Sequence, residues 1–331
     1  NGKPLPQSKG ELGMSVDHIR WFAEEARRSY GRVVSHQTEG KRHLILKSPV
    51  GVVGAIAPWN FPLVLSLRKV AAALAAGCPV ILKPASATPI CAVKLAECIE
   101  AAGFPRGVFQ LVVGKASEIG SEMLENPLCR KISFTGSTEI GKRLIEGAAK
   151  TCTRLSLELG GNAPLLIFAD ADLDKAVEGA IIAKFRNTGQ SCVASNRIYV
   201  ERFVFDAFVE KFVAATKALK IGYGLEEGMD IGPLIDEAGC ESTLRFVEDA
   251  KAKGARVLCG GTRGDGDGAF VTPAVLVDLS EDALCMSEEI FAPVAPVIPF
   301  DTEEEVVRLA NDTEYGLAAY AFTSDLNRAL R

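Results

Sequence analysis

The sequence predicts an α/β protein with mostly parallel sheets in two domains, and three observations carry this prediction. Short β-branched runs alternate with stretches of helical spacing over most of the chain, which is the rhythm of parallel strands covered by helices. The alternation breaks once, at Gly160-Gly161-Asn162, and then resumes. At 331 residues the chain is long enough for two domains that each bury a core.

The first domain is expected at 1–159. It opens with an amphipathic helix at 12–29 and a β-hairpin near 31–49, where β-prone runs at 32–37 and 42–47 flank polar residues. The alternating block follows, with strands expected at 51–57, 79–82, 108–113, 131–134 and 154–158 and helices at 63–77, 88–102, 116–125 and 137–150.

The second domain is expected at 160–331. Its predicted strands lie at 164–168, 196–201, 256–258, 273–277 and 294–299, and its predicted helices at 172–186, 203–219, 240–254 and 302–311. The Gly/Asp-rich stretch at 260–268 is interpreted as a surface loop.

Composition excludes several classes of protein. The formal net charge of −5 argues against a nucleic-acid-binding surface, which usually needs a basic stripe. Nine cysteines are scattered singly, without a CxxC pair, which favours a reducing compartment over a disulfide framework or a metal site. The longest apolar stretch near the start is too short to span a bilayer, and no signal peptide is evident. We therefore expect a cytoplasmic protein without a metal.

Cys192 stands out because of what its surroundings lack. The chain has only three histidines, His18, His36 and His43, and none after them. A nucleophilic cysteine needs an adjacent base or a lowered pKa. If Cys192 reacts, a carboxylate is the better candidate for its base, and a Cys-His hydrolase is disfavoured.

Two expected strand ends offer groups that could bind an anion. Gly136 and Ser137 open a helix and present backbone N–H groups and a hydroxyl, although a glycine turn with Ser137 as the helix cap explains the same pattern. Lys83 ends a strand where parallel sheets bind ligands, although solvated lysines are common there too. The GxGxxG fingerprint is absent, and Arg143 stands where a P-loop needs Ser or Thr, which disfavours a nucleotide hydrolase.

Five short segments occur in order along the chain: APWNFP at 57–62, FTGST at 134–138, ELGGN at 158–162, GQSC at 189–192 and EEIF at 288–291. Together they resemble the aldehyde dehydrogenase superfamily, and the chain is most similar to succinate-semialdehyde dehydrogenases. The resemblance implies a Rossmann-like NAD(P)-binding domain followed by an α/β catalytic domain. Relatives extend beyond both ends, so we expect part of a longer protein whose catalytic domain is C-terminally incomplete.

The resemblance implies roles for three residues. The Cys192 thiolate would attack the aldehyde to give a thiohemiacetal, and the Asn60 amide with the Cys192 N–H would form the oxyanion hole. After hydride transfer, Glu158 would activate the water that hydrolyses the thioester. Asn60 could instead be a turn residue. Glu158 ends an apolar strand, where a buried carboxylate is costly unless it has a function.

The cofactor is expected to be NADP or NAD. By resemblance Lys83 holds the adenosine ribose, and NAD-preferring members often carry Glu where this chain has Ser86. A hydroxyl can donate to a 2′-phosphate that a carboxylate would repel, so NADP is favoured. Glu289 matches the position that holds the nicotinamide ribose and Phe291 one that packs near the ring, although both could be ordinary strand-edge and core residues. The other implied cofactor contacts are Trp59, Gly136, Ser137, Gly141 and Leu159.

Arg68 and Arg186 match arginines that grip the distal carboxylate in succinate-semialdehyde enzymes. Guanidinium suits this task because it forms paired, charge-assisted hydrogen bonds in one plane. Glutarate semialdehyde is one methylene longer and hard to exclude, since that difference is worth only about 1–3 kcal/mol. The remaining alternatives are another aldehyde dehydrogenase, a CoA-acylating enzyme, which Glu158 argues against, and an inactive fragment. The full-length protein is expected to be a homodimer or homotetramer that binds neither nucleic acid nor membrane.

Overall fold

The computed structural model describes residues 1–331 and divides into two compact units. The first unit comprises Lys9–Leu159, and the second comprises Gly160–Arg331 together with Asn1–Ser8. The division along the chain falls between Leu159 and Gly160. The sequence placed the first eight residues with the first domain, whereas they belong to the second unit.

The sheet of the first unit has five parallel strands in the order β5-β4-β3-β6-β7. The chain runs outward from β3 through β4 to β5 and then crosses to β6 on the other side. Doubly wound sheets bind ligands at the carboxyl ends of the strands beside such a reversal. The strands are β3 (Val52–Ile56), β4 (Val80–Lys83), β5 (Phe109–Leu111), β6 (Cys129–Thr135) and β7 (Arg154–Glu158).

Helices cover both faces of this sheet. Leu67 of α2 and Leu95 of α3 pack with alternate residues of β3 and β4 on one face. Met123 of α4 and Leu144 of α5 pack with Ile132 and its neighbours on the other. The helices are α2 (Val64–Ala75), α3 (Ile90–Ala101), α4 (Ala116–Glu125) and α5 (Thr138–Ala149).

The first helix, α1, runs over Leu5–Ala26, earlier at both ends than the expected 12–29. Gly10 and Gly13 weaken the helical pattern near its start, each by roughly 1 kcal/mol relative to alanine, but burial of Glu11 and Ser15 outweighs local propensity there. Ile19 and Phe22 line an apolar groove of about 380 Å³ with side chains of α2 and α3.

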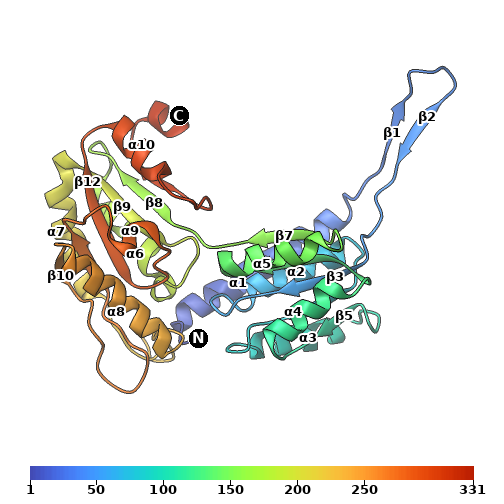
Figure 1. Ribbon diagram of the computed structural model, residues 1–331, viewed down its shortest axis with the longest axis horizontal. Helices are drawn as coiled ribbons and strands as arrows, with labels where there is room; N and C mark the ends of the chain where they lie inside the picture. The colour runs from blue at the N-terminus through green and yellow to red at the C-terminus, as the bar shows by residue number, and fades with distance from the viewer. The chain divides into compact units, whose positions relative to one another are not determined.

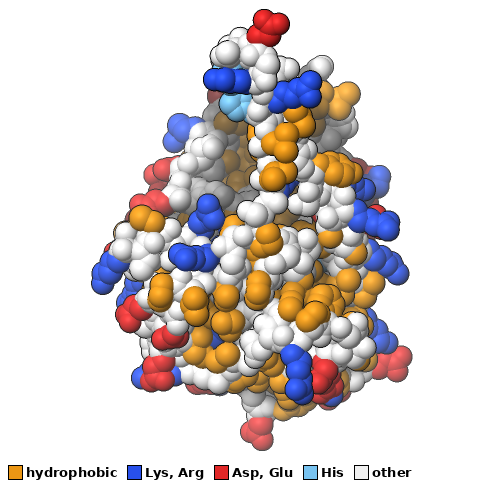
Figure 2. Space-filling model, turned by 90° about the vertical axis from the view of Figure 1, so that its right-hand side faces the viewer, with side chains coloured by type: hydrophobic (Ala, Val, Ile, Leu, Met, Phe, Trp, Pro, Cys, Tyr) orange, Lys and Arg blue, Asp and Glu red, His pale blue; other side chains and the backbone are white.

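The hairpin pairs β1 (Arg32–Ser35) with β2 (Arg42–Ile45) in an antiparallel ladder. All eight residues are exposed, and the hairpin stands away from the sheet of its unit (Figure 1). Figure 2 shows hydrophobic side chains along it. An isolated two-stranded hairpin is marginally stable by itself, so this element needs further contacts to persist.

The second unit has six strands in the order β10-β11-β12-β9-β8-β13, parallel except for β10 against β11. Helices α6 and α7 cover one face, and α8, α9 and α10 cover the other. The strands are β8 (Ala163–Ile167), β9 (Ser195–Glu201), β10 (Arg256–Cys259), β11 (Ala274–Val277), β12 (Val294–Phe300) and β13 (Tyr320–Phe322). The helices are α6 (Leu173–Phe185), α7 (Arg202–Ala218), α8 (Glu237–Ala252), α9 (Leu284–Ser287), α10 (Glu303–Asn311) and α11 (Leu326–Leu330).

The α/β fold with mostly parallel sheets, predicted from the alternating pattern, is confirmed. Three short elements were not predicted: the 3-10 turn η1 (Arg186–Gly189), α9 and β13. Each has three or four residues, too few for a periodic pattern, and β13 exists because it pairs with β8 at the sheet edge. None of the helices combines the length and apolar character needed to cross a membrane.

Candidate active site

Cys192 lies in the loop between α6 and β9, after a strained turn. Asn187 and Thr188 have φ values of 54° and 59°, in the left-handed region, which costs residues with a Cβ about 1–3 kcal/mol. Buried side chains hold this turn. Asn187 Nδ2 donates to the Gln190 carbonyl at 3.0 Å, and Thr188 Oγ1 donates to the Gly232 carbonyl at 3.0 Å. These hydrogen bonds therefore hold the strained backbone that leads to the half-buried Cys192 in place.

Two residues from other parts of the second unit contact the Cys192 loop. The Tyr320 hydroxyl donates to the Val193 carbonyl at 2.7 Å. Gly161 packs directly on the carbonyl oxygen of Cys192, so that a Cβ at this position would overlap that oxygen. The glycine is therefore required by close approach to the Cys192 backbone.

Glu289 is fastened to the same glycine turn. Its Oε1 accepts a hydrogen bond from the Gly161 N–H at 3.1 Å, and its carboxylate packs against Gly160, where a Cβ would overlap Oε2. Phe291, two residues later, has a φ of 48°. The second unit therefore brings the Cys192 backbone and the Glu289 carboxylate into contact with one short turn.

A fully buried lysine supports this turn. Lys184 Nζ donates to Asn196 Oδ1 at 3.2 Å, and Asn196 Nδ2 donates to the Gly161 carbonyl at 3.3 Å. Burial lowers the pKa of Lys184 to about 7, and the negative charge of Glu289 opposes that shift.

Arg186, in η1, is exposed. Arg186 and Cys192 both affect the pKa of the Tyr320 hydroxyl. Burial raises this pKa, the negative charge of Cys192 raises it further, and the positive charge of Arg186 lowers it. The structure therefore brings the arginine predicted to bind substrate into the electrostatic neighbourhood of the predicted nucleophile.

In the first unit, Asn60 follows β3 and is 3% exposed. The segment after it is held by Glu11 of α1, whose Oε1 accepts hydrogen bonds from the N–H groups of Leu63 and Val64 at 2.8 and 3.2 Å. This carboxylate lies at the N-terminus of α2, where negative charge is stabilising. Asn60 is thus fixed between a strand end and a capped helix.

Glu158 ends β7 beside Thr135, its register partner at the end of β6. The sequence suggested a buried carboxylate, but Glu158 is exposed, because β7 is an edge strand whose alternate residues face solvent. Lys69 of α2 is buried and donates to Thr135 Oγ1 at 2.6 Å. Burial lowers the pKa of Lys69 to about 8, although the attraction of Glu158 raises it.

The residues predicted to bind the cofactor also belong largely to the carboxyl edge of this sheet. Lys83, the last residue of β4, is 5% exposed, and burial lowers its pKa, whereas Ser86 is exposed. Ser137 caps α5, accepting from the Ile140 N–H at 3.4 Å, so the simpler reading of its hydroxyl holds. Gly141 packs against the side chain of Leu159, where a Cβ would overlap it.

Arg68, also on α2, is exposed, and its Nε donates to His18 Nε2 of α1 at 2.9 Å. Trp59 is partly buried, and its carbonyl accepts from Thr88 Oγ1 at 3.5 Å. The predicted residues therefore fall into two sets. The first unit holds Asn60, Glu158, Arg68 and most of the cofactor residues, and the second holds Cys192, Arg186, Glu289 and Phe291.

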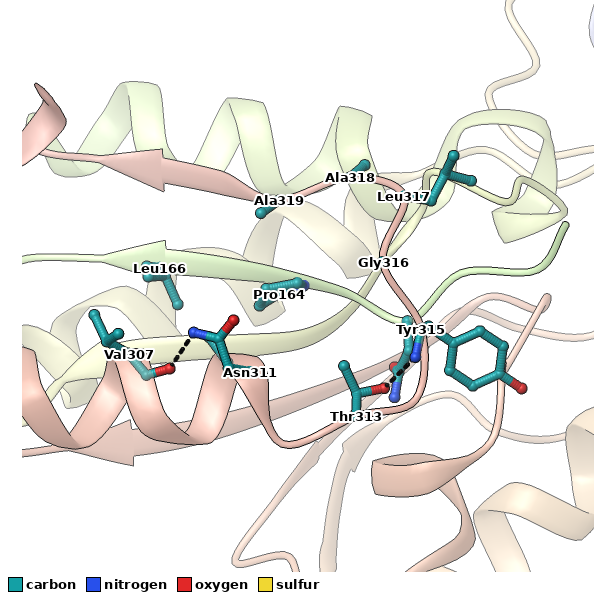
Figure 3. A pocket seen from close by; sticks show the side chains of 12 residues that line it. Pro164, Leu166, Val307, Asn311, Thr313, Tyr315, Gly316, Leu317, Ala318 and Ala319 are labelled. Carbon is teal, nitrogen blue, oxygen red and sulfur yellow. Dashed lines mark hydrogen bonds between the residues drawn. The ribbon is translucent and has the colours of Figure 1, made fainter. Parts of the chain in front are cut away.

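The second unit also has a cavity of about 400 Å³ between β8, α10 and the segment that leads to β13 (Figure 3). Its lining includes Asn162, Pro164 and Tyr315 but none of the residues predicted to act in catalysis or binding.

Sequence reasoning missed Lys69, Lys184, Glu11 and Tyr320. A signal for the two lysines was present. Lys69 lies four residues before the buried Ala73, and Lys184 lies four after the buried Ala180, so helical spacing places both on the core side of their helices. Glu11 and Tyr320 gave no such signal, because their partners are distant in sequence.

Comparison with known proteins now adds the family. The model of the aldehyde dehydrogenase family matches residues 1–331. The chain is 52% identical to a glutarate-semialdehyde dehydrogenase of Pseudomonas putida and 51% identical to a succinate-semialdehyde dehydrogenase [NADP(+)] of Escherichia coli. Both alignments cover 100% of this chain and 68% of the relative.

Among solved structures, an Escherichia coli NADP-dependent enzyme superposes with a TM-score of 0.99 at 51% identity, covering 100% of this chain and 69% of that one. Identity at this level along the whole chain, the family match over residues 1–331 and the same fold agree. The chain belongs to the aldehyde dehydrogenase family of NAD(P)-dependent oxidoreductases.

Proposed function

We propose that this protein oxidises a short aldehyde with a distal carboxylate, and succinate semialdehyde above all, to the dicarboxylate. The observation that carries the proposal is the placement of Arg186, whose charge and that of Cys192 act on one hydroxyl, that of Tyr320. An arginine that shares a neighbouring side chain with the nucleophile suits a substrate that carries a carboxylate at the end distal to its aldehyde. A relative named for succinate semialdehyde, 51% identical, supports the same substrate.

In the first half of the reaction the Cys192 sulfur attacks the aldehyde carbon. The Asn60 amide and the Cys192 N–H donate to the oxygen as it gains charge, and each such donor can be worth a hundredfold or more in rate. Both are rigidly supported, Asn60 by the strand end and capped helix, and Cys192 by the strained turn and Gly161. Fixed donors need no reorganisation when charge develops.

In the second half, Glu158 removes a proton from the water that attacks the thioester on Cys192. Its exposure suits a base that must reach water and release a proton. Lys69, whose Nζ donates to Thr135 beside Glu158, is attracted by the Glu158 carboxylate, and this attraction opposes the lowering of the Lys69 pKa by burial.

The residues of the first unit fit a dinucleotide cofactor. The strand order reverses between β3 and β6, and Gly141 lets the start of α5 lie close to Leu159. Lys83 and Ser86 would hold the adenosine ribose, and the exposed Ser86 hydroxyl can donate to a 2′-phosphate, so we favour NADP over NAD. When bound, the nicotinamide supplies the hydride acceptor. Glu289 would hold its ribose, and Phe291, Trp59, Gly136 and Ser137 would complete the binding residues.

We accordingly assign cofactor binding to the first unit and the nucleophile to the second. We also propose that the full-length protein is a homodimer or homotetramer. The hairpin β1–β2 supports this, because Val33, Leu44 and Leu46 are more than 60% exposed on an element that is marginal alone. Size-exclusion chromatography with light scattering would measure the assembly.

Glutarate semialdehyde is a second candidate substrate, favoured by the relative with 52% identity. The decisive experiment is a panel of succinate semialdehyde, glutarate semialdehyde and butanal on the full-length protein, with NADP and with NAD, followed by nicotinamide absorbance. We expect kcat/KM for succinate semialdehyde to exceed that for butanal by at least tenfold, with NADP preferred. Equal efficiency with butanal would contradict the assignment of a distal carboxylate.

A further inference from the structure

The arginine proposed to bind the substrate carboxylate in the first unit is held by a histidine from another helix. Arg68 Nε on α2 donates to His18 Nε2 on α1 at 2.9 Å. His18 Nδ1 lies 2.7 Å from the Met14 carbonyl oxygen, one helical turn earlier. His18 is partly buried, whereas Arg68 is exposed.

These two contacts determine where the imidazole carries its proton. A carbonyl oxygen only accepts, so Nδ1 must be the donor to Met14. A guanidinium only donates, so Nε2 must offer its lone pair to Arg68. His18 is therefore neutral, with its hydrogen on Nδ1, and the bond to Met14 selects the tautomer that can accept from Arg68.

The same contact determines which edge of the guanidinium is available. Nε is occupied by His18, while the structure shows no protein partner for either Nη atom of Arg68. The two Nη atoms form the end-on fork that pairs with both oxygens of a carboxylate. A long side chain tied at Nε also loses less conformational freedom when a ligand binds, because part of that freedom is already gone.

We propose that His18 is a positioning residue for substrate specificity: it orients Arg68 so that its terminal fork receives the distal carboxylate of the aldehyde. This inference rests on the proposed function, since it takes Arg68 as the carboxylate-binding residue. We take His18 to act through Arg68 alone, so its effect falls on carboxylate affinity and leaves the chemistry at Cys192 unchanged.

The test compares His18→Phe, which keeps the ring bulk without an acceptor, with His18→Gln, whose side-chain oxygen can accept near the position of Nε2. Asp17→Asn, exposed on the same helix, is the matched control for a local change of charge. For His18→Phe we expect KM for succinate semialdehyde to rise roughly three- to tenfold, the worth of one hydrogen bond, with kcat kept within twofold. Inhibition by succinate should weaken by the same factor, and the kinetics of butanal should not change.

His18→Gln should restore KM to within about twofold of the parent protein, and Asp17→Asn should match it. Equal KM values in the Phe, Gln and parent proteins would overturn the inference, and so would a loss of butanal oxidation in parallel with that of succinate semialdehyde. The variant Arg68→Ala tests the binding of the carboxylate by Arg68 separately from the positioning role of His18. If it raises KM while His18→Phe does not, the proposed function stands and the role of His18 falls. If Arg68→Ala also leaves KM unchanged, the assignment of Arg68 to the carboxylate falls together with the role of His18, and the proposed function is then decided by Arg186→Lys and the substrate panel.

Discussion

At the scale of single side chains, Glu158 separates the two halves of the proposed reaction. Glu158→Gln keeps the shape but removes the base that activates water. We expect the variant to form one equivalent of reduced cofactor per active site in a burst, after which turnover slows by at least about a hundredfold. Stopped-flow absorbance measures both phases. A variant that loses the burst together with turnover would place Glu158 in the first half of the reaction instead.

Arg186 provides a second prediction at this scale. Arg186→Lys retains the charge but loses the planar fork, and we expect KM for succinate semialdehyde to rise by roughly tenfold or more, because a charge-assisted pair becomes a single contact. The KM of butanal should stay the same. The matched control is Arg256→Lys on β10, in an exposed ion pair with Asp278, the residue that follows β11. Equal increases for both aldehydes would show that Arg186 acts on the loop and not on the carboxylate.

The sequence predicts individual roles where a residue sits in a distinctive motif, as Cys192 and Asn60 do, and these roles stay predictions. The burial and the contacts of a residue were harder to predict where they depend on its surroundings in the fold. Glu158 was expected to be buried because it follows apolar residues, yet exposure depends on β7 being the last strand of its sheet. Tyr320 could not be connected with Cys192, since its contact to Val193 spans 127 residues.

At the scale of elements, the turn Gly160–Asn162 connects the nucleophile loop with Glu289, which leads to a third prediction. A methyl group at position 161 would overlap the Cys192 carbonyl, so Gly161→Ala should displace the loop and lower kcat/KM by about a hundredfold or more. The control is Gly316→Ala, in the same unit, where a Cβ meets nothing within 4 Å.

Circular dichroism should show that both glycine variants keep their secondary structure, and the burst amplitude should report the lost active sites. If Gly161→Ala stayed as active as Gly316→Ala, the Cys192 loop would have to be tolerant of displacement, and the support we assign to it would be wrong.

The elements themselves were largely predictable, because the alternating blocks fix strands such as β3 and β9 through their apolar runs. The exceptions have physical reasons. Helix α1 begins earlier than its periodicity suggests because buried Glu11 caps another helix, and that contact is not visible in local spacing. Strand β13 has three residues and is stabilised by pairing with β8 alone.

At the scale of the whole molecule, the buried Lys184 connects protonation with the free energy of unfolding. Its pKa is about 7 in the folded protein, against an ordinary value of 10.5 when unfolded. Below pH 7 both states hold the proton and the burial penalty is complete. Between about pH 7 and 10.5 the unfolded state holds more protons than the folded state, so the contribution to stability rises with pH. Above 10.5 both are neutral and the penalty is gone.

Because the contribution of Lys184 to stability rises with pH, replacing this residue should change how the melting temperature depends on pH. Lys184→Met removes the titrating group and leaves a chain of similar length. The melting temperature of the parent protein should therefore rise relative to that of the variant as the pH increases from 7 to 10. The corresponding change in the free energy of unfolding is a few kcal/mol at most, since each pKa unit of difference is worth about 1.4 kcal/mol.

Comparing the two proteins at each pH cancels the other groups that titrate in the range, and it also cancels the constant effect of losing the bond to Asn196. Lys175→Met, exposed on the same helix, should show a melting-temperature difference that does not change with pH. A constant difference for Lys184→Met as well would mean that Lys184 keeps its proton in the folded state, held by the charge of Glu289.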